Sequence, residues 1–237
     1  MLKKCIGIVS YFVPEHRDER IMGITKLLRQ IEGFWPDIDV LIIAQDWQDF
    51  QIPETSNNVT VINFDEPLGI LGARNALFEE FLKRDYDYLI PLDDDTKIAC
   101  DDPQIAADYM AIIDAHPDRF AFVRSSKRVS AYHPYRGYEF WLCALSRYII
   151  EQEPFPQLDI RTDDGHEDTI YATLLWNKYP NLDFKLPAGI KGIQRPNVTS
   201  TYHSTALAER RTSALAQYIV QNRKLPSDLR AFINKID

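Results

Sequence analysis

Three consecutive aspartates, Asp93, Asp94 and Asp95, have the residue type and spacing that most directly suggest chemistry. They follow the apolar stretch YDYLIPL at residues 86–92, which has the composition of a buried strand. Carboxylates crowded at the end of such a strand repel one another, and a divalent cation relieves that repulsion. In an extended chain Asp93 and Asp95 point to the same side, so one can hold Mg²⁺ or Mn²⁺ while the other binds a ligand hydroxyl. A solvated acidic turn is the alternative interpretation.

A second acidic group lies in the motif Gly165-His166-Glu167-Asp168, whose last residue lies 73 positions after Asp95. It opens the segment TIYATLLW, whose apolar residues recur at helical spacing. The helix dipole favours acidic residues in a first helical turn, so capping alone would account for this motif.

The pattern of apolar residues predicts the elements that must position these groups. Short apolar runs predict buried strands, and apolar residues at helical spacing predict helices. The expected strands are 5–13, 39–44, 59–64, 86–92, 120–125 and 140–145, and the expected helices are 21–31, 75–83, 103–113, 167–177 and 206–223.

Apolar strands separated by helices predict an α/β fold. We expect a mostly parallel central sheet with helices on both faces, and a smaller antiparallel portion in the second half. Ligands of open α/β sheets bind beyond the carboxyl ends of the strands, which is where the triplet lies. The 237 residues are expected to form a single domain.

Composition excludes several classes of protein. The chain is 45% hydrophobic and 26% charged, which is a globular balance, and its net charge of −8 argues against nucleic acid as the main partner. No segment has the apolar length of a membrane span, and no leader peptide is expected. Three cysteines without paired spacing favour a reduced, cytoplasmic protein.

The segment LGILGARNALFEEFLKRDYDYLIPLDDD, residues 68–95, resembles the core of GT-A glycosyltransferases, especially the inverting family 2 group. That group has a G-x-x-x-A-x-N-like loop and helix, followed by an apolar strand that ends in a D-x-D motif. Here Gly69 to Asn75 are expected to form the loop, and Asp93 and Asp95 supply D-x-D. The resemblance implies a Rossmann-like GT-A domain and a metal-dependent transferase that uses a nucleotide-diphosphate sugar. A donor-binding half at about residues 1–100 and an acceptor half at about 101–237 follow from it.

The resemblance also implies roles for individual residues. By similarity to the G-G-E-D-D type of motif, Asp168 is the general base and Glu167 binds an acceptor hydroxyl. Mn²⁺ or Mg²⁺ is expected on Asp95 and Asp93, with His203 as a further ligand. The residues expected to bind the nucleotide sugar are Tyr11, Pro14, Asp46, Arg74, Asp93 and Asp94.

The expected partners are a nucleotide-diphosphate sugar, with UDP taken as the default nucleotide, and a glycan or lipid-linked glycan acceptor. A lipid-linked acceptor would be met by peripheral contact with a membrane. Three alternatives stay open: a retaining GT-A glycosyltransferase, a sugar-phosphate nucleotidylyltransferase, and a metal- or glycan-binding α/β module that is not an enzyme.

Overall fold

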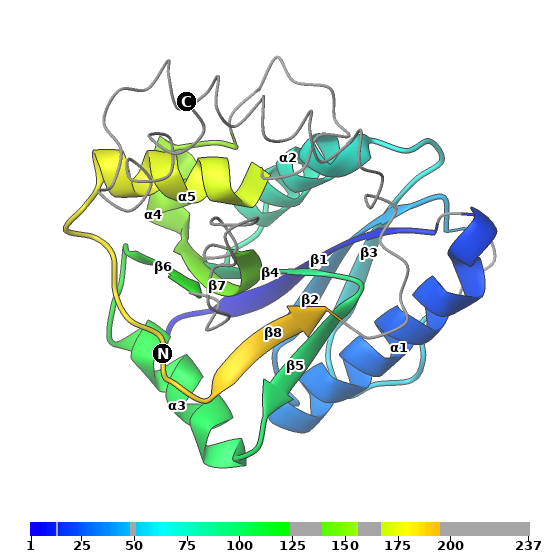
Figure 1. The fold of residues 1–237 in the computed structure, drawn as a ribbon, viewed down its shortest axis with the longest axis horizontal. Coiled ribbons are helices and arrows are strands. Elements are labelled where there is room, and N and C mark those ends of the chain that lie inside the picture. Colours follow the sequence, from blue (N-terminus) through cyan, green and yellow to red (C-terminus); the bar gives the residue numbers. More distant parts are fainter. Residues whose placement is uncertain (13, 48–50, 124–138, 156–166, 195–237) are drawn as a thin grey trace, which may run out of the picture.

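The structure, a computed structural model, describes residues 1–12, 14–47, 51–123, 139–155 and 167–194. Strands and helices alternate along most of this part of the chain (Figure 1). The strands are β1 (Lys4–Tyr11), β2 (Asp39–Gln45), β3 (Val59–Phe64), β4 (Tyr88–Asp93), β5 (Thr96–Cys100), β6 (Phe120–Val123), β7 (Glu139–Ser146) and β8 (Ile190–Gln194). The helices are the 3₁₀ turn η1 (Pro14–His16), α1 (Arg17–Phe34), α2 (Gly69–Leu82), α3 (Pro103–Asp114), α4 (Arg147–Gln152) and α5 (Glu167–Lys178).

A six-stranded sheet in the order β3-β2-β1-β4-β7-β6 forms the centre of the fold. The β1–β2, β2–β3 and β1–β4 pairs are parallel, whereas β7 is antiparallel to both β4 and β6. A second, two-stranded sheet consists of antiparallel β5 and β8. The predicted fold class, a mostly parallel sheet with a smaller antiparallel portion in the second half, is confirmed.

Each face of the central sheet is covered by its own apolar cluster. Alternate residues of β1 belong to opposite clusters, with Cys5 and Val9 on one face and Ile6 and Ile8 on the other. The first face packs against α2, α4 and α5, and the second against α1, α3 and the small sheet (Figure 1). Gly7 lets α2 approach β1, because a Cβ at this position would lie 2.8 Å from the Leu77 side chain.

Helix α2 differs from the predicted loop and helix. Residues 69–75 were expected to form a loop, but α2 begins at Gly69, so they make up its first turns. The physical reason is burial: Leu71 and Ala73 face the sheet together with Leu77, which extends the apolar stripe toward the N-terminus. Gly69 takes a positive φ of 68° there, and the Leu68 N–H donates to Gln45 Oε1 at 2.7 Å.

Other predicted elements agree with the structure to within a few residues. Helix α3 begins as expected, because the Asp102 carboxylate accepts the Gln104 N–H at 2.8 Å and Pro103 occupies the first helical position. Strands β5 and β8 and helix α4 were not predicted. The expected helix 206–223 lies outside the described residues. Within the described residues, every helix is too short or too polar to cross a lipid bilayer.

Candidate functional site

The acidic triplet forms the turn between the two sheets. Asp93 is the last residue of β4, Asp94 and Asp95 form the turn, and Thr96 is the first residue of β5. Two hydrogen bonds fix this turn: the Asp93 N–H donates to Thr96 Oγ1 at 3.3 Å, and the Asp94 N–H donates to the Val9 carbonyl at 3.2 Å. The triplet therefore lies at the carboxyl end of β4, where the topology places ligand sites.

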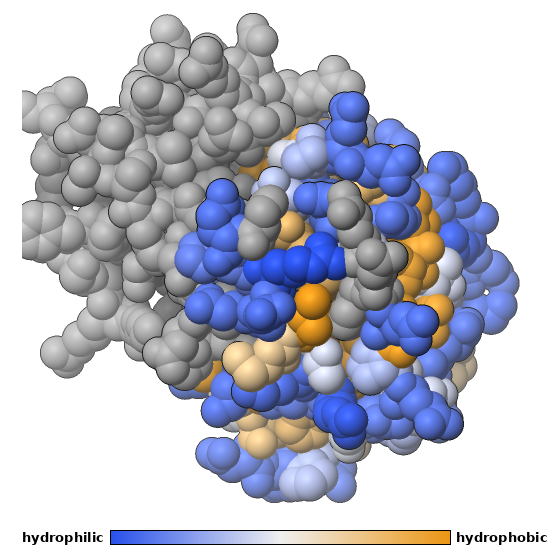
Figure 2. All heavy atoms as spheres, turned by 90° about the vertical axis from the view of Figure 1, so that its right-hand side faces the viewer, coloured by the Kyte–Doolittle hydropathy of each residue, from blue (hydrophilic) through white to orange (hydrophobic). Residues whose placement is uncertain are grey.

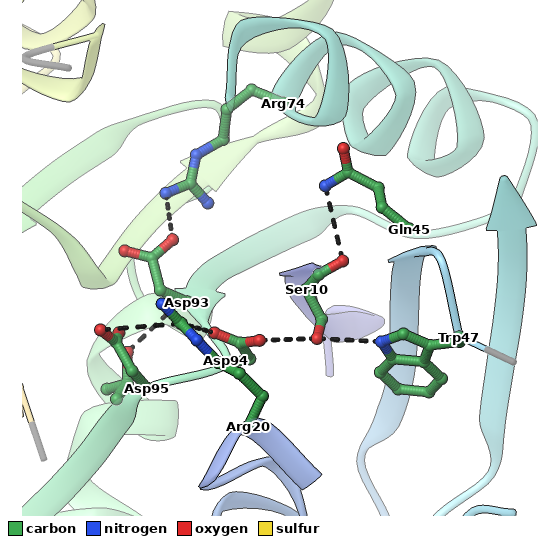
Figure 3. Close-up of polar contacts among 9 residues, drawn as sticks. Ser10, Arg20, Gln45, Trp47, Arg74, Asp93, Asp94 and Asp95 are labelled. Carbon is green, nitrogen blue, oxygen red and sulfur yellow. Dashed lines mark hydrogen bonds and ion pairs between the residues drawn. The ribbon is translucent and has the colours of Figure 1, made fainter. Parts of the chain in front are cut away.

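Asp93 faces α2 and forms an ion pair with Arg74 (Figure 3). The distance from Arg74 Nη2 to Asp93 Oδ1 is 2.5 Å, and the two side chains are 1% and 29% exposed. A guanidinium buried to this degree needs a counter-charge, which Asp93 supplies. The more exposed Asp93 carboxylate is thus held in place by a buried arginine of α2.

Asp94 faces the opposite side of the sheet and is buried. Its Oδ1 accepts from Arg20 Nη1 at 2.6 Å, and its Oδ2 accepts from the Ser10 hydroxyl at 2.7 Å. Trp47 Nε1 in turn donates to Ser10 Oγ at 3.1 Å (Figure 3). Burial raises the pKa of Asp94 above its ordinary value, against the lowering effect of the Arg20 charge and the Ser10 hydrogen bond.

Asp95 completes the cluster beside Arg20. Its Oδ2 lies 4.0 Å from Arg20 Nη1, a longer contact than the one between Arg20 and Asp94. Three carboxylates and two guanidinium groups leave the cluster one negative charge in excess when all of them are ionised. A cation that binds here is therefore attracted by a net negative site.

The residues at the end of β2 form the neighbouring part of this edge. Gln45 links three elements, because its Nε2 donates to the Ser10 carbonyl at 3.4 Å and its Oε1 accepts the N–H that begins α2. Asp46 has a positive φ of 57°, which turns the chain sharply after β2, and Arg17 donates to its carbonyl at 3.4 Å. Next to it, Trp47 stacks on Phe12 with ring centroids 4.8 Å apart.

The surface at this edge is mainly hydrophilic. Figure 2 views the molecule from the side at which β1 and β4 end, and hydrophilic residues there surround smaller apolar areas. Tyr11, the last residue of β1, and Asp46 are both half-buried at this edge. These two predicted donor-binding residues therefore lie at the same edge of the sheet as the triplet.

Asp168 lies on α5, which packs on the same face of the sheet as α2. The Tyr171 ring of α5 contacts Phe78 of α2 with centroids 5.6 Å apart and stacks on Phe155 at 5.0 Å. Asp168 is half-buried, and it contributes, like Asp93, to the electrostatic environment of the buried Cys143 thiol. Burial raises the pKa of this thiol well above its ordinary value, Arg74 opposes the rise, and Asp168 and Asp93 add to it.

The structure brings several predicted site residues together and leaves others undescribed. Tyr11, Asp46, Arg74 and the triplet lie at one edge of the sheet, whereas Asp168 lies on α5, which packs on the same face of the sheet as α2. The side chains of Pro14 and Glu167, and all of His203, lie outside the described residues.

Four further polar residues at this edge were not predicted: Ser10, Arg20, Gln45 and Trp47. One of them carries a signal in the sequence. Arg20 shares helical spacing with Ile24, Leu27 and Ile31, so an arginine occupies the N-terminal end of the otherwise apolar stripe of α1. A charged residue at such a position requires a buried partner.

The described carboxylates suit a hard divalent cation that also binds a substrate. No group of three or more His, Cys, Asp or Glu with metal-binding geometry occurs among the described residues. Mg²⁺ is commonly held by one or two carboxylates plus substrate phosphates, and such a site needs no larger protein cage. Asp93 and Asp95 could supply those two carboxylates, while both oxygens of Asp94 already accept hydrogen bonds inside the fold. The two were expected to point to the same side of an extended chain, but Asp95 belongs to a turn and lies beside Arg20, whereas Asp93 pairs with Arg74.

Comparison with solved structures gives the chain a glycosyltransferase-like α/β fold. The chain is similar to TarS of S. aureus, with a TM-score of 0.63 and 12% sequence identity, over 98% of this chain and 43% of TarS. A structure of TarS 1–349 matches with a TM-score of 0.49 and 11% identity, over 98% of this chain and 69% of that one. The chain thus spans less than half of the longer TarS chain. No protein family model and no curated protein matches the sequence.

Proposed function

We propose that the chain is a glycosyltransferase that moves a sugar from a nucleotide-diphosphate sugar to a hydroxyl of a glycan acceptor. One observation carries this proposal: the acidic triplet, with Arg74 paired to it, ends β4 in a chain that shares its fold with TarS, a glycosyltransferase. Carboxylates and a guanidinium at the carboxyl end of a parallel strand suit a ligand that contains a sugar and phosphates.

The donor is bound by the half of the chain that contains β1 to β4. Asp93 and Asp95 hold Mn²⁺ or Mg²⁺, with Tyr11, Asp46 and Arg74 beside the nucleotide and UDP as the first nucleotide to test. The metal, when bound, supplies positive charge that stabilises the leaving diphosphate. Arg74, which is paired with Asp93, would lie beside a cation held there and could donate charge-assisted hydrogen bonds to the diphosphate.

The acceptor is activated by Asp168, with Glu167 binding one of its hydroxyls. A sugar hydroxyl is a poor nucleophile until its proton is removed, and a positioned carboxylate contributes about 10²–10⁴-fold to the rate. The acceptor oxygen attacks the anomeric carbon of the donor from the side opposite the phosphate while Asp168 takes its proton. The bond from that carbon to the diphosphate breaks with its electron pair on the diphosphate, and the configuration of the sugar inverts.

Calorimetric titration of UDP, GDP, CDP and dTDP, each with and without Mn²⁺, tests the donor part of the proposal. We expect one nucleotide to bind in a metal-dependent manner, and Asp95→Ala to abolish that binding. Asp37→Ala is the matched control, because it removes the same charge from an exposed turn just before the start of β2. If none of the four nucleotides binds with or without metal, the chain is an α/β binding module and the proposal is wrong.

Analysis of the product tests the acceptor part. A product whose anomeric configuration is opposite to that of the donor supports Asp168 as a base. Retention of configuration would be compatible with the proposed donor site but would overturn the role of Asp168, because a retaining transferase needs no such base.

A further inference from the structure

Arg20 contacts the triplet from the side of the sheet opposite to Arg74. It belongs to α1, whose apolar stripe packs on the second face of the sheet, and its side chain is 10% exposed. Its Nη1 lies 2.6 Å from Asp94 Oδ1 and 4.0 Å from Asp95 Oδ2. One guanidinium therefore reaches two neighbouring carboxylates of the turn.

The buried aspartate ties the turn to two other elements. Its backbone N–H donates to the carbonyl of Val9 on β1 at 3.2 Å, and its Oδ2 accepts from Ser10 at 2.7 Å. Its Oδ1 is held by α1 through Arg20. The side chain of Asp94 is thus fixed from both sides and cannot turn toward the solvent while these contacts persist.

Fixing Asp94 inward determines where its neighbours point. Successive side chains of an extended segment point to opposite sides, so Asp93 faces away from Asp94. Its side chain is 29% exposed, against 4% for Asp94. Asp95, on the other side of Asp94, is only 12% exposed and lies beside Arg20. The placement of both flanking carboxylates therefore depends on the turn that the buried ion pair holds.

We propose that Arg20 is a positioning residue of this site: by holding Asp94 inside the fold, it orients Asp93 and Asp95 toward the metal and the donor diphosphate. This inference rests on the proposed function for the identity of the ligand. It deepens that function, because it assigns a role to a residue of α1 that reaches the site through Asp94 and Asp95.

Positioning and simple electrostatics predict opposite effects of removing Arg20. A guanidinium 4.0 Å from Asp95 repels an incoming cation, so its charge alone would make Arg20→Gln bind Mn²⁺ more tightly. If Arg20 positions the turn, Arg20→Gln instead allows Asp94 to move, and the binding of Mn²⁺ weakens. The sign of the change in affinity therefore separates the two roles.

Titration of the full chain with Mn²⁺ alone is the test. We expect Arg20→Gln to weaken Mn²⁺ binding at least tenfold and Arg20→Lys, which keeps a cation near Asp94, to restore most of the affinity. The matched control is Arg29→Gln, an exposed arginine of the same helix, and it should leave the affinity unchanged. Unchanged or tighter binding by a folded Arg20→Gln would overturn the proposal.

A second variant covers the case in which Arg20→Gln does not fold. Gly23 lies on α1 where a Cβ would meet the Asp94 carbonyl at 3.2 Å, so Gly23→Ala presses on the turn and keeps every charge. It should weaken Mn²⁺ binding, whereas Gly33→Ala, where a Cβ has nothing within 4 Å, should not. Equal affinity of both glycine variants and the wild type would overturn the proposal.

A crystal structure of Arg20→Gln separates failure of this inference from failure of the proposed function. If the wild type binds no Mn²⁺ at all, the metal part of the proposed function is wrong, and the structure decides the role of Arg20. A shifted Asp94 side chain and turn are expected, because glutamine does not replace the ion pair that holds Asp94 against α1. An unchanged turn would overturn the positioning role.

Discussion

Two glycines of α1 differ in what surrounds them, and this difference gives a quantitative prediction. A Cβ on Gly33 would have nothing within 4 Å, whereas a Cβ on Gly23 would lie 3.2 Å from the carbonyl oxygen of Asp94. That oxygen belongs to a turn whose backbone is already bonded to β1, with the Asp94 N–H at 3.2 Å from the Val9 carbonyl. The turn therefore cannot easily yield to an added methyl group.

The expected change in stability has opposite signs at the two positions. Replacing a helical glycine by alanine stabilises a protein by about 0.5–1 kcal/mol, and Gly33→Ala should gain that amount. Gly23→Ala gains the same propensity but incurs an overpacking cost of about 1–3 kcal/mol. We expect it to lower the free energy of unfolding by up to about 2 kcal/mol. For a chain of this length, each kcal/mol shifts the melting temperature by about 2–4 °C.

Thermal unfolding followed by circular dichroism, with urea unfolding beside it, measures both variants against the wild type. Gly33→Ala should melt at a higher temperature and Gly23→Ala at a lower one, and the double variant should show the sum of the two effects, because the sites are far apart on the helix. If Gly23→Ala were stabilised as much as Gly33→Ala, α1 would not press on the turn, and the reasoning would be refuted.

Three further predictions concern the site. Asp168→Asn should lower kcat by about 10²–10⁴-fold with little change in the binding of donor nucleotide, measured by steady-state kinetics and calorimetry; equal losses in both would contradict a role as base. Arg74→Met should tighten the binding of Mn²⁺ alone, since a competing cation is removed, and weaken the binding of nucleotide diphosphate by about tenfold to a hundredfold. Calorimetry measures both affinities, and weaker binding of Mn²⁺ together with weaker binding of nucleotide would argue against competition between Arg74 and the metal. A thiol reagent should modify Cys100 alone in the native protein, because the other two cysteines are buried, so Cys100→Ser should not react until it unfolds.

The sequence was most informative where burial is continuous. Apolar runs predicted β1, β2 and β4 to within a few residues, because strands covered on both faces have little room for polar side chains. The triplet was found for the same reason, since three carboxylates stand out after such a strand. Small elements were harder to predict: β5 has only five residues and pairs with β8, which lies 90 positions further along the chain. No local pattern encodes a pairing of that kind.

The supporting residues of the site were missed because their partners are distant in the sequence. Ser10 and Gln45 are ordinary polar residues of a strand until β4 and α2 are placed beside them. The position of Arg20 on the apolar stripe of α1 indicates a buried arginine with an acidic partner, but the sequence alone does not indicate that this partner is Asp94. The predicted start of α2 differs from the observed one because glycine is typical of loops, whereas the positive φ of Gly69 serves the first turn of the helix.

The ion pair between Arg20 and Asp94 also has a consequence for how the protein forms. It joins residues 74 positions apart in the chain, and the bond from Ser10 to Asp94 spans 84 positions. Contacts of such separation form after large loops have closed, so β4 must join β1 before the turn takes its final orientation. A nascent chain that stops before Asp94 lacks the carboxylate that Arg20 binds. The acidic turn therefore does not form as a local loop around a cation. It takes its final orientation only when β4 has paired with β1, so affinity for a metal would appear only once the sheet has formed.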